Sequence, residues 1–170
     1  MKRASEADSL QQALGAVLEG LAFYELAQVV SADTRVKVTF EDLGRRKAAQ
    51  LKRLEQVAGP TARDGAFYPS LYPLDAVSKA ECYVCGHVVE TRDMPSQCPK
   101  CGTARYTFEK EIALTKAWEI AAETSRKSAD LFRALAGKSQ GKARDLLDAL
   151  SKEDQALAAE AGKELTELRS

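Results

Sequence analysis

All four cysteines of the chain lie in one stretch, CYVCGHVVETRDMPSQCPKC, at residues 82–101. They form two C-x-x-C pairs with twelve residues between the pairs. Two short turns of this kind each present two thiolates, and four thiolates can surround one metal ion tetrahedrally. A glycine follows the second cysteine of each pair, where a tight turn benefits from a residue without Cβ. The spacing therefore predicts one metal site, with the ligands Cys82, Cys85, Cys98 and Cys101.

The spacing alone does not identify the metal. Tetrahedral four-thiolate sites suit both zinc and iron. Zinc would make the site a structural knuckle without electron chemistry, whereas iron would make it a one-electron carrier. Disulfide bonds are the remaining interpretation of the paired cysteines, and a reducing compartment disfavours them.

Composition excludes several classes of function. The chain has 170 residues, 45% of them apolar, and its 25 basic residues balance its 25 acidic ones. Zero net charge does not favour a nucleic-acid-binding surface. The N-terminus has no apolar run after its basic residues, and no stretch approaches 18 uninterrupted apolar residues, so we expect no signal peptide and no membrane span. The sequence thus predicts a cytoplasmic protein with neither a nucleic-acid nor a membrane partner.

Four long helices are predicted around the cysteine stretch, because apolar residues recur there at three- and four-residue steps. Their approximate ranges are 5–30, 33–58, 107–136 and 142–168. Two helical hairpins of this kind predict a mainly α fold, a four-helix bundle with the cysteine stretch inserted between helices two and three. The expected organisation is helices one and two in residues 1–60, a linker in 61–79, the metal-binding insert in 80–108, and helices three and four in 109–170.

The linker before the cysteines is rich in both proline and aromatic residues, with FYPSLYP at its centre. Disordered linkers avoid aromatic residues. We therefore expect an ordered strap that packs over a helix, with contact to a ligand as the alternative.

The segment ECYVCGHVVETRDMPSQCPKCGTARYTFEK resembles the rubredoxin-like domain of rubrerythrins. The shared features are the CxxCG start, the spacer length, the proline before the second pair, the CPxCG motif and the trailing Phe-Glu. The flanking helices resemble the ferritin-like bundle of the same family through their FYE pattern and hairpin arrangement. The resemblance implies iron rather than zinc at the four cysteines, a homodimer, and a redox partner that the sequence does not identify. In that family the rubredoxin part usually follows the bundle, whereas here it interrupts the bundle.

The resemblance also draws attention to a second metal centre. Rubrerythrins carry a di-iron peroxidase centre in the bundle, which requires a glutamate from each of two helices and an E-x-x-H motif from each of the other two. The only histidine here is His87, inside the cysteine stretch, so neither E-x-x-H motif exists. We therefore expect no di-iron centre in the bundle. The matching positions fall on Val17, Ser125, Lys47 with Gln50, and Glu153 with Ala156.

Lys47 and Glu153 occupy corresponding inward positions of the two hairpins. A buried lone ion is costly, so it must be neutralised or paired. One hypothesis is a Lys47–Glu153 ion pair with Gln50 and Ser125 as hydrogen-bond partners. In the alternative, the lysine extends along its helix to reach water.

The sequence thus predicts a rubrerythrin-like metal-binding protein that acts as a rubredoxin-type one-electron carrier without a working di-iron peroxidase centre. One alternative is a scaffold or interaction protein in which zinc holds the cysteines. The other is a rubrerythrin-type peroxidase with relocated ligands, an enzyme activity that the bundle residues do not support.

Overall fold

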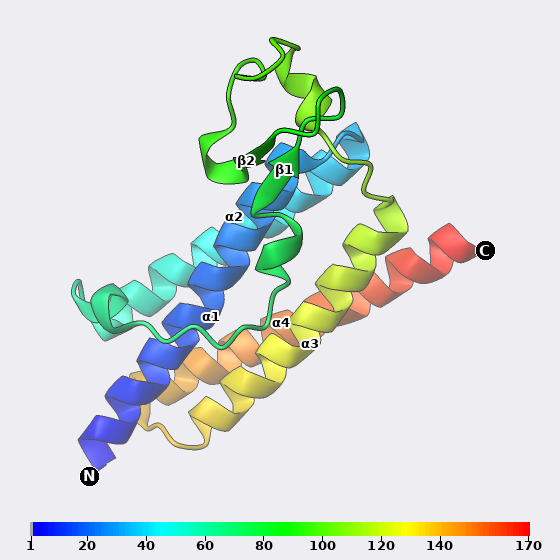
Figure 1. Cartoon of the computed structure of the whole chain (residues 1–170). Coiled ribbons are helices and arrows are strands. Elements are labelled where there is room, and N and C mark those ends of the chain that lie inside the picture. The colour runs from blue at the N-terminus through cyan, green and yellow to red at the C-terminus, as the bar shows by residue number, and fades with distance from the viewer. Residues whose placement is uncertain (1) are drawn as a thin grey trace.

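A computed structural model describes the backbone of residues 2–170 and the side chains from residue 6 onward. Two helical hairpins lie side by side, α1 with α2 and α3 with α4 (Figure 1). The connection between α2 and α3 carries the linker and the cysteines, so the predicted mainly α four-helix bundle with a small insert is confirmed. The helices are α1 Lys2–Val30, α2 Thr34–Ala58, α3 Leu114–Ala136 and α4 Gly141–Arg169.

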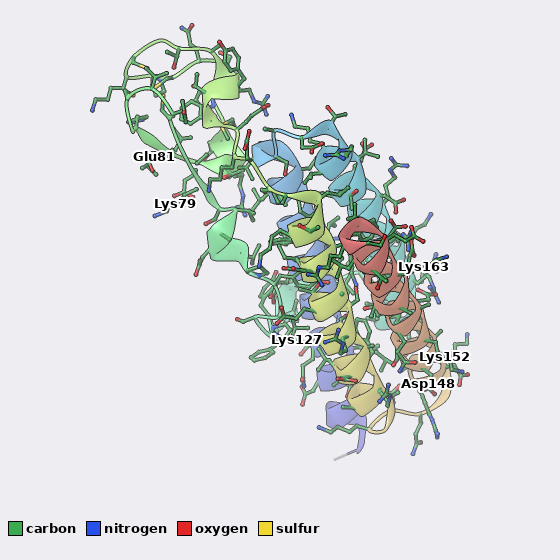
Figure 2. The ribbon with its side chains drawn as sticks, turned by 90° about the vertical axis from the view of Figure 1, so that its right-hand side faces the viewer. Lys79, Glu81, Lys127, Asp148, Lys152 and Lys163 are labelled. Atoms are coloured by element: carbon green, nitrogen blue, oxygen red, sulfur yellow. The ribbon has the colours of Figure 1, made fainter. Side chains whose placement is uncertain are left out.

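The insert contains the only regular strands of the described chain, β1 (Lys79–Glu81) and β2 (Val88–Glu90). They pair antiparallel, with Ala80 opposite Val89. The insert projects beyond one end of the bundle, as Figure 2 shows from the side, with Lys79 and Glu81 of β1 labelled. The cysteine site is therefore set apart from the bundle centre.

Helix α3 begins later than predicted. Residues 105–108 form a 3-10 turn, and α3 begins only at Leu114 instead of near residue 107. Lys110 N–H donates to the Val30 carbonyl at 2.6 Å, and Ala32 N–H donates to the Lys110 carbonyl at 2.9 Å. The segment before α3 thus pairs with the end of α1, and this pairing replaces helical hydrogen bonds.

The strap between α2 and the insert is tied to α1 by a buried carboxylate. Glu19 accepts hydrogen bonds from Ser70 N–H at 2.9 Å and from Tyr72 N–H at 2.8 Å. The Tyr72 ring enters the core, where its centroid lies 5.7 Å from those of Phe23 and Tyr24. The predicted ordered strap over a helix is therefore confirmed.

The core continues from the bundle into the insert. One apolar cluster contains Tyr24 and Tyr72 from the bundle side together with Cys82, Cys98 and Phe108 from the insert. A second cluster fills the other end of the bundle. Because burial of apolar area is the main stabilising contribution to folding, the shared cluster fixes the insert against the bundle.

Helix α1 is apolar in composition. Within Glu6–Val30, an 18-residue window has a mean hydropathy of 1.4, which is long and apolar enough to cross a membrane by composition alone. This composition does not test the expectation of no membrane span, because the buried core helix of a bundle meets the same criterion. Of that window, 61% is buried inside the bundle. Core packing thus accounts for the apolar composition.

The close approach of strap and helix gives a matched pair of predictions. A Cβ on Gly15 of α1 would lie 1.6 Å from the Phe67 carbonyl oxygen, whereas one on Gly162 of α4 would meet nothing within 4 Å. Gly→Ala inside a helix normally stabilises by about 1 kcal/mol. We expect G162A to raise the free energy of unfolding by about that amount, and G15A to lower it by about 1–3 kcal/mol because of overpacking. Urea unfolding measures both, and equal effects would show that the strap does not lie on α1.

Candidate metal centre

Two loops of the same design present the cysteines. In the first loop, Cys82 N–H donates to the His87 carbonyl at 2.7 Å. In the second, Cys98 N–H donates to the Thr103 carbonyl, also at 2.7 Å. Each hydrogen bond joins a cysteine to the residue five positions later, so each C-x-x-C pair is held in a tight turn.

The glycine after each pair closes these turns. Gly86 N–H donates to the Cys82 carbonyl at 2.8 Å, and Gly102 N–H donates to the Cys98 carbonyl at 2.9 Å. Their φ angles are 78° and 76°, in the left-handed region that glycine adopts without steric cost. The requirement for glycine that the spacing predicted is therefore confirmed.

The four sulfur atoms form a compact group, with every pair within 4.8 Å. The Cys82 and Cys101 Sγ atoms are 3.9 Å apart, and those of Cys85 and Cys98 are 3.6 Å apart. A tetrahedral site with metal–sulfur bonds of about 2.3 Å has edges of about 3.8 Å. All four cysteines are free, since a disulfide needs about 2.05 Å. The donor set and its dimensions thus fit one tetrahedral metal ion.

The site has an inner and an outer side. Cys82 and Cys98 are buried, at 2% and 1% exposure, whereas Cys85 is half-buried and Cys101 is exposed. Tyr83, next to the first ligand, is 90% exposed. Two ligands therefore anchor the site to the core, and the other two approach solvent.

Hydrogen bonds favour the thiolate form of two of the ligands. The Cys85 backbone N–H, followed by the Thr103 hydroxyl, lowers the pKa of Cys82 to about 5 despite partial desolvation. The Thr103 hydroxyl and backbone N–H likewise lower the pKa of Cys101. Because the thiolate is the form that binds metal, these donors favour metal binding at Cys82 and Cys101, whereas burial and the neighbouring cysteine sulfurs raise the pKa of Cys85.

Comparison with known families agrees with this geometry. Residues 81–109 match the family model described as the rubrerythrin, rubredoxin-like domain. The insert is thus similar to a rubredoxin-like domain. The match confirms the resemblance inferred from the cysteine motifs, and it concerns the insert rather than the helices. Comparisons with curated proteins and with solved structures found no match to the chain.

The centre of the bundle holds a buried ion pair. Lys47 Nζ donates to Asp154 Oδ2 at 3.1 Å and to Gln50 Oε1 at 3.0 Å. The side chains of Lys47 and Asp154 are both 1% exposed. The sequence prediction of a pair was right about the lysine but wrong about Glu153, and the alternative in which the lysine reaches water is also wrong.

The error is one residue of register on α4. Leu150, Asp154 and Leu157 follow one another at helical spacing and are buried. Glu153 lies one position earlier and is exposed, where it pairs with Arg53 across the surface. Both Glu153 and Asp154 fit the helical spacing between Leu150 and Leu157, so periodicity alone did not decide which carboxylate faces the interior.

The hydroxyl partner also differs from the prediction. Ser128 Oγ donates to Asp154 Oδ2 at 2.6 Å. Ser125 is fully buried, and its hydroxyl has no hydrogen-bond partner among the described residues. Gln50 Nε2 donates to Asp154 Oδ1 at 2.9 Å. Gln50 is therefore a hydrogen-bond partner of the ion pair, as predicted. Asp154 thus accepts from an ammonium, an amide and a hydroxyl.

Proposed function

We propose that the protein is a one-electron carrier in which Cys82, Cys85, Cys98 and Cys101 hold a single iron ion. The observation that carries this proposal is the set of four sulfur atoms at tetrahedral spacing within a rubredoxin-like domain. When bound, iron would supply a reversible one-electron change, with a potential set by hydrogen bonds to sulfur and by solvent exposure.

The chain would hold the metal site rigid and leave one of its ligands accessible to a redox partner. The buried ligands Cys82 and Cys98 hold the site against the core, so the sulfur positions need not change between oxidation states. The exposed ligand Cys101 provides a short route to an external redox partner. The family resemblance extends the proposal to a homodimer in the cytoplasm, with a donor and an acceptor on other proteins.

The bundle is proposed to act as a scaffold without a di-iron peroxidase centre. At its centre an ammonium, an amide and a hydroxyl contact the one fully buried carboxylate, that of Asp154, and the amide also reaches the exposed Glu153 at 3.4 Å. An ammonium 3.1 Å from the carboxylate opposes cation binding there, because like charges repel strongly in a buried site. The electron would therefore leave the chain rather than pass to an internal partner.

A second candidate function is supported by the shared core. Cys82 and Cys98 lie in the same apolar cluster as Tyr72 and Phe108. Any tetrahedral metal at the cysteines, zinc included, would fix the crossover from α2 to α3. In that case the protein would be a scaffold that binds other proteins, and the metal would stabilise its fold (a metal-stapled scaffold).

Redox titration of the iron-loaded protein tests the proposal. We expect a reversible one-electron transition, in which visible thiolate-to-iron absorption is lost on reduction and returns on oxidation. We also expect no turnover of hydrogen peroxide with a reductase present. An irreversible transition would contradict the carrier role, and catalytic peroxide consumption would favour a peroxidase with relocated ligands.

A further inference from the structure

One hydroxyl group lies directly against the sulfur atoms of two ligands. Thr103 Oγ1 is 3.2 Å from Cys101 Sγ and 3.6 Å from Cys82 Sγ. Both distances suit an O–H···S hydrogen bond, which is longer than a bond to oxygen because sulfur is larger. Metal-bound thiolates have no hydrogen to give, so the threonine must be the donor in any such bond.

A neighbouring threonine lies close to the same sulfur but has no hydrogen to offer it. Thr107 Oγ1 is 3.8 Å from Cys82 Sγ, yet it donates its single hydrogen to the Ala104 carbonyl at 2.7 Å. Thr107 Oγ1 is also 3.2 Å from Thr103 Oγ1, where it can only accept. Thr107 therefore competes with the sulfur atoms for the Thr103 hydrogen.

We propose that Thr103 tunes the metal centre by donating its hydroxyl hydrogen to the thiolates of Cys101 and Cys82, and that Thr107 limits this donation by accepting part of it. A hydrogen bond to a ligand sulfur withdraws electron density from it. The reduced site carries one more negative charge than the oxidised site, so the bond stabilises the reduced form more. Thr103 thus raises the reduction potential. The hydrogen bonds to sulfur rest on the proposed four-thiolate site whichever metal occupies it, whereas the effect on the reduction potential rests on the proposed iron carrier.

Three substitutions separate hydrogen bonding from packing. Thr103→Val keeps the shape and removes the donor, Thr103→Ser keeps the donor, and Thr107→Val removes the competing acceptor. In the iron-loaded protein we expect T103V to lower the reduction potential by up to about 59 mV, which is a tenfold change in the equilibrium constant of a one-electron couple. T103S should stay near the unsubstituted protein. T107V should leave the potential unchanged or raise it.

A second readout does not depend on iron. In the cobalt(II)-substituted protein, loss of a hydrogen bond raises the energy of the sulfur lone pairs. The thiolate-to-cobalt charge-transfer band of T103V should therefore move to longer wavelength, and that of T103S should not. If the iron form shows no reversible reduction while the cobalt band still moves in T103V, the carrier function fails and the role of Thr103 stands.

Two results would overturn the role of Thr103. One is a T103V protein with an unchanged cobalt band and, where the iron form is reversible, an unchanged potential. The other is a shift in T107V of the same direction and size as in T103V, which would assign the effect to packing. Metal content near one per chain in each variant confirms that the comparison is made between folded sites.

Discussion

Replacing Lys47 by methionine is expected to lower the free energy of unfolding by about 3–5 kcal/mol, the cost of leaving a buried charge without its partner. The substitution leaves the Asp154 carboxylate at 1% exposure, with hydrogen bonds from Gln50 and Ser128 but no counter-charge. Replacing Asp154 by leucine should cost a similar amount, because the ammonium then keeps only Gln50 Oε1. Chemical unfolding of protein in one defined metal state measures both.

The double substitution distinguishes an ion pair from two independent packing losses. Lys47→Met combined with Asp154→Leu should recover much of the lost stability, since a buried pair exchanged for apolar residues is often close to neutral. The matched control is Arg45→Met, which removes an exposed pair with Glu41 and should change stability by less than about 1 kcal/mol. If Lys47→Met cost no more than Arg45→Met, Lys47 would not be paired in the interior.

Replacing Cys98 by serine is expected to abolish stoichiometric metal binding and to loosen the insert without unfolding the bundle. Cys98 is buried at 1% exposure and belongs to the cluster that joins insert and bundle. The free energy of metal binding at sites of this kind is of order 10–16 kcal/mol and acts as folding free energy. Hydrogen exchange should therefore accelerate in residues 79–109. It should change little in the N-terminal half of α4, which lies at the end of the bundle away from the insert and packs in the second cluster.

The control for this variant is His87→Ala. The backbone carbonyl of His87 accepts from Cys82 N–H, and alanine keeps that carbonyl. We expect H87A to bind one metal per chain as the unsubstituted protein does, and a strong chelator on the unsubstituted protein to reproduce the exchange pattern of C98S. Unchanged metal affinity in C98S would exclude the four-cysteine site.

The cysteine site could be predicted because its determinants are local in sequence. Two C-x-x-C pairs, each followed by a glycine that must adopt positive φ, fix the loops almost without reference to the rest of the chain. The four-helix bundle followed similarly from helical periodicity. The start of α3 did not, because Lys110 pairs with the distant Val30 in place of continuing a helix.

The interior of the bundle shows why a register is hard to obtain from sequence alone. Glu153 and Asp154 are adjacent carboxylates, and a rotation of α4 by one residue decides which of them meets Lys47. That rotation depends on how all four helices pack. The role proposed for Thr103 had no sequence signal either, because it depends on Thr107 giving its hydrogen to Ala104.

The most direct test of the central claim is metal analysis, together with a visible spectrum, of protein purified from its native host. We expect about one iron per chain and the absorption bands of thiolate-to-iron charge transfer, lost on mutation of Cys98. One zinc per chain and no colour would contradict the electron-carrier function and favour the metal-stapled scaffold. Clearly more than one iron per chain would contradict a bundle centre closed by Lys47 and Asp154.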